Sequence, residues 1–193
     1  MRPFKLAVAV TLGLLLLGVS AQSSRAEDAF AKITGVTQGI ILGDQPNIPS
    51  IPAALNNVQV FGTGISIEVP APAPGGGSTG RPTPGPLVLT KGVDRASPKL
   101  LRAAFFGEQL TVDISWIMNL AGTPRQTVTI KLEGASIAKI DSRAELTGPN
   151  ASFGEIVTLS YQKITMTVPT INAQGQVSGT TTICLDLIAN KAC

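Results

Sequence analysis

The chain has 193 residues, of which 44% are hydrophobic and 14% are charged, enough apolar sequence for one domain with a sizeable core. It contains no His and only two Cys, which excludes His-dependent catalysis, His metal ligands and a four-thiolate zinc site. The formal charge is +3, but without Arg2, Lys5 and Arg25 of the N-terminal segment twelve basic residues balance twelve acidic ones, so the sequence predicts no nucleic-acid-binding surface.

The N-terminal segment, residues 1–26, has the features of a secretory signal peptide. Arg2 and Lys5 form a basic start, residues 6–19 are apolar but short for a membrane span, and Ser24 and Ala26 supply small residues before a cleavage site. A second candidate site follows Ala21. We therefore predict an exported protein, periplasmic or extracellular, whose mature domain covers residues 27–193 without stable membrane insertion.

Two alternatives to cleavage remain open at this point. An uncleaved segment would be a membrane anchor, which the short apolar run disfavours. A misassigned start would leave a cytoplasmic protein, but the next Met is Met118, well inside the domain.

The first part of the mature chain predicts two strands, over residues 30–36 and 58–69, separated by a Pro-rich loop over residues 43–57. Apolar positions in the second strand change parity at Gly62 and Gly64, which predicts a bulge or a barrel bend. Residues 70–86 predict a flexible Pro/Gly loop. Its Gly-rich run lacks the Gly-Lys-Ser/Thr ending and the following helix of a phosphate-binding loop.

A short strand, a helix and the start of another strand are predicted over residues 87–110. The apolar run at 87–89 is broken by the residues at 91–94. Ser97 occupies the expected N-cap position, with Pro98 at the first helical position. Gly107 is expected to end the helix because glycine tolerates positive φ.

The predicted helix has one apolar face, formed by Leu100, Leu101, Ala104 and Phe105. Phe106 falls outside this face, beside Lys99 and Arg102. A single exposed Phe is ordinary on a protein surface. It is also the residue through which we expect a contact between copies of the chain.

Alternation of apolar and polar residues predicts further strands in the second half of the chain. They cover residues 109–117, 128–140 with an interruption at Gly134, 156–168 with a bulge at 162–163, and 180–187. In the last strand the inward positions are Ile183, Leu185 and Leu187. About seven short strands and one helix indicate a sandwich or a barrel.

The segment TKGVDRASPKLLRAAFFGEQL resembles the TKxxDxxSPxLxxAxxxGxxI region of the Hcp (haemolysin-coregulated protein) family, whose members form the tube of type VI secretion systems. The Gly-rich loop, the strand LSYQKITMTV and the ending TTICLDLIANK extend this resemblance over most of residues 28–191. The residues that match the central motif are Thr90, Lys91, Asp94, Ser97, Pro98 and Leu100.

The resemblance implies a mainly β fold, an Hcp-like β-barrel of two sheets with one short flanking α-helix. It also implies a structural protein without cofactors, a homohexameric ring that stacks into a tube and carries effectors in its lumen. Its partners would then be further copies, secretion-system components and effector proteins. The main alternative is an exported Hcp-like binding or carrier module that works outside a secretion tube.

Carboxylates are the only candidate catalytic groups that the sequence offers. Asp94, Glu108 and Asp113 lie near one another along the chain, and a carboxylate pair could serve a secreted hydrolase such as a glycosidase. We expect instead surface charges, with Asp94 and Lys91 as turn and packing residues and Trp116 in the core. No catalytic, cofactor-binding or metal-binding residue is predicted.

Cys184 and Cys193 are the only cysteines, and an exported chain enters an oxidising compartment. Cys184 should lie on the outer face of the last strand, where the tail can turn back through Asn190 to reach it. We therefore predict a disulfide bond between Cys184 and Cys193, either within one chain or between neighbouring subunits.

Overall fold

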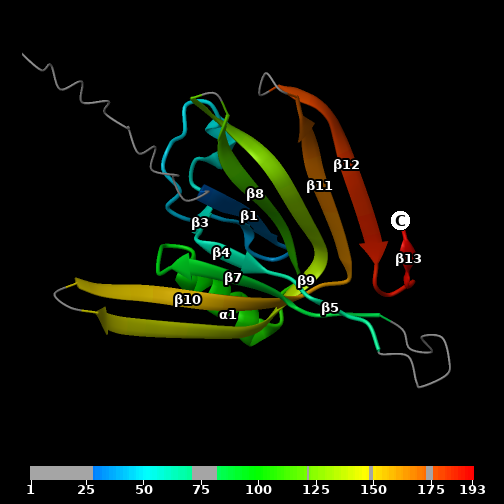
Figure 1. The fold of residues 1–193 in the computed structure, drawn as a ribbon. Coiled ribbons are helices and arrows are strands. Elements are labelled where there is room, and N and C mark those ends of the chain that lie inside the picture. Colours follow the sequence, from blue (N-terminus) through cyan, green and yellow to red (C-terminus); the bar gives the residue numbers. More distant parts are fainter. Residues whose placement is uncertain (1–27, 71–81, 121, 148–149, 173–175) are drawn as a thin grey trace, which may run out of the picture.

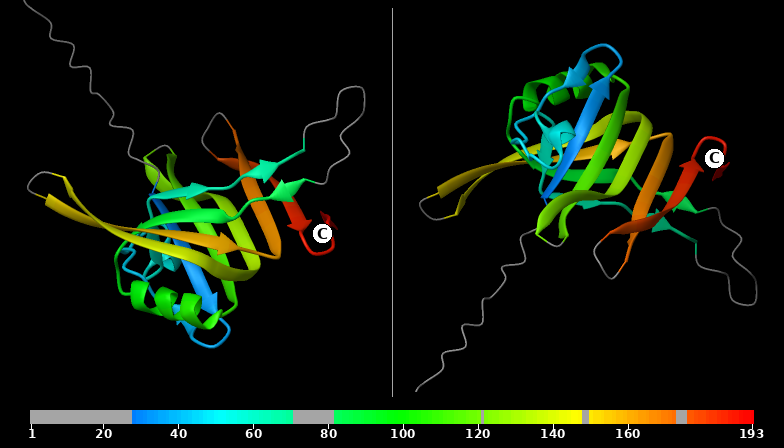
Figure 2. Two further views of the ribbon diagram at one scale, coloured as in Figure 1. Left: turned by 90° about the horizontal axis from the view of Figure 1, so that it is seen from below. Right: turned by 90° about the horizontal axis from the view of Figure 1, so that it is seen from above.

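The computed structural model describes residues 28–70, 82–120, 122–147, 150–172 and 176–193. The predicted signal peptide and the Gly-rich run at residues 75–77 lie outside the described residues. The fold is mainly β, a barrel of two sheets with one short helix at its side (Figures 1 and 2). None of the helices that the structure describes is both long and apolar enough to cross a membrane.

The first sheet contains the N-terminal strands and the last ones. Its strands are β1 (Asp28–Gly35), β2 (Gly39–Ile41), β3 (Val58–Val60), β8 (Leu110–Leu120), the first half of β9 (Thr123–Thr147), β11 (Lys163–Ile171), β12 (Val177–Asp186) and β13 (Lys191–Ala192). β1 is paired on one side with β8 and on the other with β2 and β3.

The second sheet is smaller. Its strands are β4 (Gly62–Gly64), β7 (Leu87–Gly92), β10 (Asn150–Ser160) and the second half of β9. The strands β5 (Ile67–Glu68) and β6 (Thr83–Pro84) form a separate ladder that leads away from the barrel (Figure 1). The predicted loop over residues 43–57 contains a single 3-10 turn, Pro52–Ala54.

The long strand β9 joins the two sheets because it turns a corner at Gly134. Residues 123–135 pair with β8, and residues 136–147 pair with β10. Gly134 has φ +58°, a conformation that glycine adopts at little cost, and a Cβ there would meet the side chain of Gln162. The predicted interruption at Gly134 is therefore a change of sheet.

The prediction of a single strand over residues 156–168 is wrong. β10 ends at Ser160 and β11 begins at Lys163, and the two strands belong to different sheets. The corner between them lies beside the corner of β9, since the amide of Gln162 donates to the carbonyl of Glu133 (3.1 Å). The bulge predicted at residues 162–163 marks this corner, but without Gly or Pro the local sequence gave no sign that the strand ends there.

The predicted bend at Gly62 and Gly64 is also a change of sheet. β3 pairs with β1 in the first sheet, whereas β4 pairs with β7 in the second. What the sequence indicates as one strand over residues 58–69 is thus three short strands, β3, β4 and β5. Val58 and Val60 before the parity change are buried, whereas Ile65, Ile67 and Val69 after it are exposed.

The core lies between the two sheets and under the helix. It is formed by buried apolar residues from both sheets, among them Ile33, Val58, Leu87, Leu89, Leu110, Ile114, Leu132, Val157 and Leu159. Trp116 is partly buried and packs against this cluster, as expected. Leu185 and Leu187 also pack against it, but Ile183 is 54% exposed, so its predicted inward position is wrong.

The helix α1 (Ser97–Phe106) connects the second sheet to the first (Figure 2). It ends at Gly107, whose φ of 62° confirms the predicted stop. The predicted N-cap is wrong, because Ala96 holds that position and no side chain caps the helix. The hydroxyl of Ser97 instead forms hydrogen bonds with an ion pair between β7 and β10, which is described below.

Candidate assembly surface

The outward side of α1 is apolar. Only Leu100 and Ala103 are buried in the helix, whereas Leu101 is 62%, Phe105 83% and Phe106 70% exposed. The predicted apolar face is therefore buried at Leu100 and partly at Ala104, whereas Leu101 and Phe105 are exposed. A helix that packs one narrow stripe on a sheet buries fewer residues than a wide apolar face suggests.

Three exposed side chains of α1 and one of the β1–β2 turn make a surface that we call the helix patch: Leu101, Phe105, Phe106 and Val36. The rings of Phe105 and Phe106 lie edge to face with their centroids 5.1 Å apart. Arg102 places its guanidinium 6.0 Å from the centre of the Phe106 ring. Apolar groups rimmed by a charge are typical of surfaces that bind another protein.

A shallow cavity of about 460 Å³ lies beside Phe106. Its lining comes from the β1–β2 turn and the C-terminal end of α1, namely Val36, Thr37, Arg102, Phe106, Gly107, Glu108 and Gln109. The helix patch therefore includes a cavity beside its apolar side chains. A side chain of a partner protein can fill this cavity.

Glu108 holds the two walls of this cavity together. Its Oε1 accepts the backbone amides of Thr37 (2.7 Å) and Gln38 (2.8 Å), and its Oε2 accepts the side-chain amide of Gln38 (2.7 Å). Desolvation raises the pKa of Glu108, but the hydrogen bonds from Gln38 and Thr37 and the charge of Arg102 outweigh it and lower the pKa below the usual value. Sequence patterns gave no sign of this clasp, because its partners are about 70 residues away.

A second cluster of charges lies under the N-terminal end of α1. Lys91 is 1% exposed, and its Nζ lies 2.8 Å from both Asp94 Oδ1 and Glu155 Oε2. The same ammonium group donates to the hydroxyl of Ser97 at 2.9 Å and to the carbonyl of Gly92 at 2.6 Å. Ser97 in turn donates to Glu155 Oε2 at 2.7 Å. Every donor of the buried lysine thus has an acceptor.

This network explains three of the six motif residues, Lys91, Asp94 and Ser97. Asp94 also accepts the amide of Ala96 at 3.0 Å, which is the expected turn role. Lys91 belongs to β7 rather than breaking the strand, and its side chain points inward as a buried charge. Glu155 was not predicted as the partner of Lys91. It is a single acidic residue beside an apolar strand, a pattern that indicates a buried partner for a lysine. Desolvation raises the pKa of Glu155, but hydrogen bonds from Lys91 and Ser97 outweigh it and lower the pKa.

The three carboxylates considered for hydrolysis do not come together. Asp94 precedes α1 and Glu108 follows it, and a helix of ten residues is about 15 Å long. Asp113 lies on β8 opposite Lys32 and Lys131. The separation of Asp94 and Glu108 exceeds the roughly 5–9.5 Å between the carboxylates of glycosidases.

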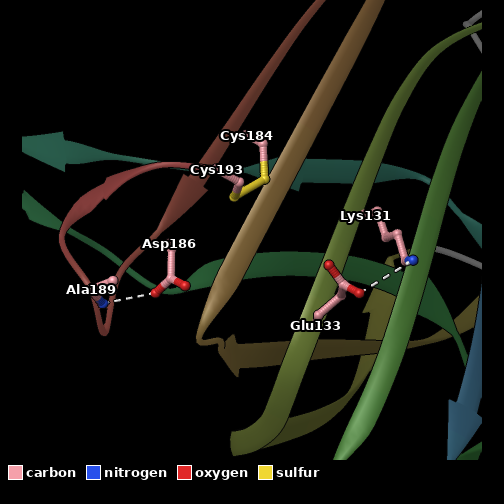
Figure 3. The surroundings of a disulfide bond; sticks show 6 residues. All are labelled: Lys131, Glu133, Cys184, Asp186, Ala189 and Cys193. Atoms are coloured by element: carbon pink, nitrogen blue, oxygen red, sulfur yellow. Dashed lines mark hydrogen bonds and ion pairs between the residues drawn. A yellow bond between two sulfur atoms is a disulfide. The ribbon is translucent and has the colours of Figure 1, made fainter.

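The tail folds back on β12 at the other side of the barrel (Figure 3). Cys184 and Cys193 are joined by a disulfide bond with an S–S distance of 2.06 Å. The amide of Cys193 donates to the carbonyl of Cys184 (3.1 Å), and Asp186 accepts the amide of Ala189 (2.8 Å) in the intervening turn. Asn190 takes φ 51° in this turn, where the sequence placed the reversal of the tail.

Comparison with known proteins is consistent with this geometry. The family model described as "Type VI secretion system effector, Hcp" matches residues 54–168. The "Major exported protein" of Pseudomonas aeruginosa is 35% identical over 153 residues, which cover 74% of this chain and 89% of that protein.

Solved structures show the same fold. The crystal structure of Hcp1 from Salmonella typhimurium superposes with a TM-score of 0.67 at 23% identity, over 87% of this chain and 99% of that chain. The secreted protein Hcp3 from Pseudomonas aeruginosa superposes with a TM-score of 0.57 at 30% identity, over 81% of this chain and 97% of that chain.

Proposed function

This chain belongs to the Hcp family, the tube proteins of type VI secretion systems, and on that basis we propose that it is a structural protein that forms a homo-oligomeric ring. The ring is a hexamer that stacks into a tube, and it has no catalytic role. The observation that supports this proposal best is the helix patch, which presents two Phe rings in edge-to-face contact to solvent.

Burial of the helix patch against a neighbouring copy supplies the driving force. A fully buried Phe side chain contributes about 1.5–3 kcal/mol relative to an exposed one. Phe105 and Phe106 are both more than two-thirds exposed in the single chain, so most of this free energy is gained only on assembly.

The outer face of the first sheet is the surface that we assign to the lumen. Residues that lie opposite one another on neighbouring strands share a face. One such row contains Lys32, Asp113 and Lys131, and another contains Glu133, Lys163, Asp186 and Lys191. Positive and negative charges alternate along both rows, four positive against three negative. A polar face with little net charge keeps a channel wetted and suits effector proteins of different charge.

Light scattering of the mature protein, residues 27–193, tests the ring. We expect a mass several times that of one chain, and Phe106→Ser should reduce it to that of one chain. Phe153→Ser is the matched control, because Phe153 is 61% exposed on β10 and lies outside the helix patch. A monomeric wild-type protein at micromolar concentration would exclude the ring.

The second candidate function is a binding or carrier module outside a secretion tube. The signal-peptide features of residues 1–26 favour it, because type VI tubes assemble in the cytoplasm in the family that this chain belongs to. The "Major exported protein" shows by its name that a relative reaches the exterior. A monomer that retains a bound partner from the periplasm would favour this function over the ring.

A further inference from the structure

The tail that carries Cys193 is held on the barrel by its disulfide bond and a few hydrogen bonds. Residues 188–193 are all exposed, so none of their side chains is buried in the core. The strand β13 pairs with only two residues of β12, Leu185 and Asp186. Asn190 in the preceding turn has φ 51°, a left-handed conformation that costs residues other than glycine free energy. Opening the disulfide bond therefore releases the tail with little loss of packing.

The two cysteines of this bond differ in exposure. Cys193 is exposed, whereas Cys184 is half-buried on β12 (Figure 3). Disulfide bonds exchange when a thiolate attacks one of the two sulfur atoms, and exposed bonds are the labile ones. Because the attacking thiolate has to reach a sulfur atom directly, the Sγ of Cys193 is the target and the sulfur of Cys184 is the one that leaves.

Lys163 favours the departure of Cys184. Thr165 of β11 lies opposite Cys184, and Lys163 lies two residues before Thr165 on the same face. Long side chains reach their diagonal neighbours across such a pair of strands. Lys163 also lies opposite Asp186 and Glu133, but it forms no ion pair within the part of the chain that the structure describes. A nearby ammonium group stabilises a thiolate and so makes it a better leaving group.

Cys184 faces the surface that we assign to the lumen. Leu185 packs against the core, so Cys184 beside it points to the opposite, outer face of the first sheet. The row of side chains that contains Lys131 continues through Thr165 and ends at Cys184. A molecule carried along this face therefore meets the disulfide bond.

We propose that the disulfide bond between Cys184 and Cys193 is a site of reversible covalent attachment for a passenger polypeptide that carries a cysteine thiol. A thiolate of the passenger forms an S–S bond with the Sγ of Cys193. The bond between the two native cysteines breaks, and its electron pair stays on the Sγ of Cys184, which becomes a thiolate. One disulfide bond and one thiolate are present before and after this step, so no oxidant or reductant is consumed.

Release of the passenger is the reverse step. The thiolate of Cys184 attacks the Sγ of Cys193, restores the native bond and expels the passenger as a thiolate. While the passenger is attached, residues 188–193 serve as a short tether. This inference rests on the proposed ring only for the location of the site in a lumen, because the exchange itself takes place within one chain.

Glutathione tests the exchange step in the oxidised protein. After a brief exposure and a quench with N-ethylmaleimide, the intact mass should show one glutathione and one maleimide on the same chain. Peptide mapping should place the glutathione on Cys193 and the maleimide on Cys184. Removal of glutathione before the quench should restore the native bond. Glutathione on Cys184 would overturn the proposal, as would a bond that stays intact in the folded protein but reacts in the urea-unfolded one.

A second probe distinguishes a polypeptide from a small thiol. An unfolded, reduced polypeptide with a single cysteine should form a linked product with this protein, visible on a non-reducing gel and lost with reductant. The same polypeptide with Ser in place of its cysteine is the control and should form none. Reaction with glutathione but not with the polypeptide would assign the site to small thiols and overturn the passenger role.

Substitution of Lys163 tests the leaving group. Lys163→Gln should slow the exchange with glutathione several-fold, because the thiolate of Cys184 loses its cation. Lys139→Gln is the matched control, since Lys139 is 64% exposed and lies in the second sheet. Equal rates for the two variants would overturn the role assigned to Lys163.

A destabilised variant separates local opening of the tail from global unfolding. Lys91→Met removes the buried cation that pairs with Glu155, far from the tail in the chain. Exchange through local opening should keep its rate in this variant, whereas exchange through global unfolding would accelerate about a hundredfold or more. Urea below the unfolding transition gives the same comparison in wild type. A rate that follows global stability would overturn the proposal. A monomer by light scattering that still exchanges at Cys193 would reject the ring and leave the attachment site standing.

Discussion

Lys91 and Glu155 are 64 residues apart and form a buried ion pair, with 2.8 Å between Nζ and Oε2. The pair joins β7 to β10 directly beneath the first turn of α1, because Ser97 at the start of the helix bonds to both side chains. The motif segment is thus held in place by a charge that comes from the far half of the chain.

Breaking this pair from one side should be costly. Lys91→Met leaves the carboxylates of Glu155 and Asp94 without their cation, so we expect a loss of about 3–5 kcal/mol in the free energy of unfolding by urea. Glu155→Gln should cost less, because Asp94 still pairs with Lys91. Lys139→Met is the control, since Lys139 is 64% exposed and its pair with Asp141 should be worth about 1 kcal/mol or less. An equally small effect at Lys91 would contradict the network. The double variant Lys91→Met with Glu155→Leu should cost less than the sum of the single changes.

The lowered pKa values of Glu108 and Glu155 predict loss of stability in acid. Below the ordinary carboxyl value near 4.5, the unfolded chain takes up protons before these two folded-state carboxylates do. The stability they provide is therefore complete above that pH and is lost as pH falls through their lowered values. Thermal unfolding between pH 7 and pH 3 should show a falling Tm.

A variant assigns part of this pH dependence to one residue. Glu108→Gln should flatten the fall of Tm, because the side chain no longer titrates. Glu133→Gln, at a surface pair with Lys131, serves as the control. If the pH profile of Glu108→Gln matched that of wild type, the clasp on Thr37 and Gln38 would not depend on the charge of Glu108.

The disulfide bond should stabilise the tail and the edge of the first sheet. A closed loop with a sequence separation of 9 contributes roughly 2–3 kcal/mol in the chain-entropy model. Reductant should lower the Tm of wild type and leave that of the double variant Cys184→Ser with Cys193→Ser unchanged. Non-reducing gels distinguish the two pairings: a bond within one chain runs as a monomer, and a bond between subunits runs as a covalent dimer. Two free thiols in protein from its native compartment would exclude both.

Cleavage of the N-terminal segment is a prediction about the native protein. N-terminal sequencing should start at Glu27, or at Gln22 if the earlier site is used. A full-length chain in the membrane fraction would indicate an anchor. A chain that keeps the segment, or starts later, in the cytoplasm would refute export and favour assembly of the tube in that compartment.

Local patterns predicted most of the elements but not how they pair. Alternating residues located β8 and β12, and Pro98 with Gly107 located α1. The corner between β10 and β11 showed in the sequence only as the predicted bulge at residues 162–163, a pattern that does not distinguish a bulge from a change of sheet. Leu101 and Phe105 were assigned to one apolar face because a helical wheel shows which residues share a face, not how wide a stripe the sheet covers.

By itself, the sequence determined the class of the fold, the family motif and the absence of histidine chemistry, and it predicted that the only two cysteines are bonded without deciding whether within one chain. These depend on composition and on residues close together in the chain. Only the tertiary structure decided that Glu155 neutralises Lys91, that Glu108 clasps the β1–β2 turn, and that β13 and β4 stand at the two ends of the strand order among the described residues. Each of these depends on strand pairing between distant segments, where the free energy comes from contacts that no local pattern records.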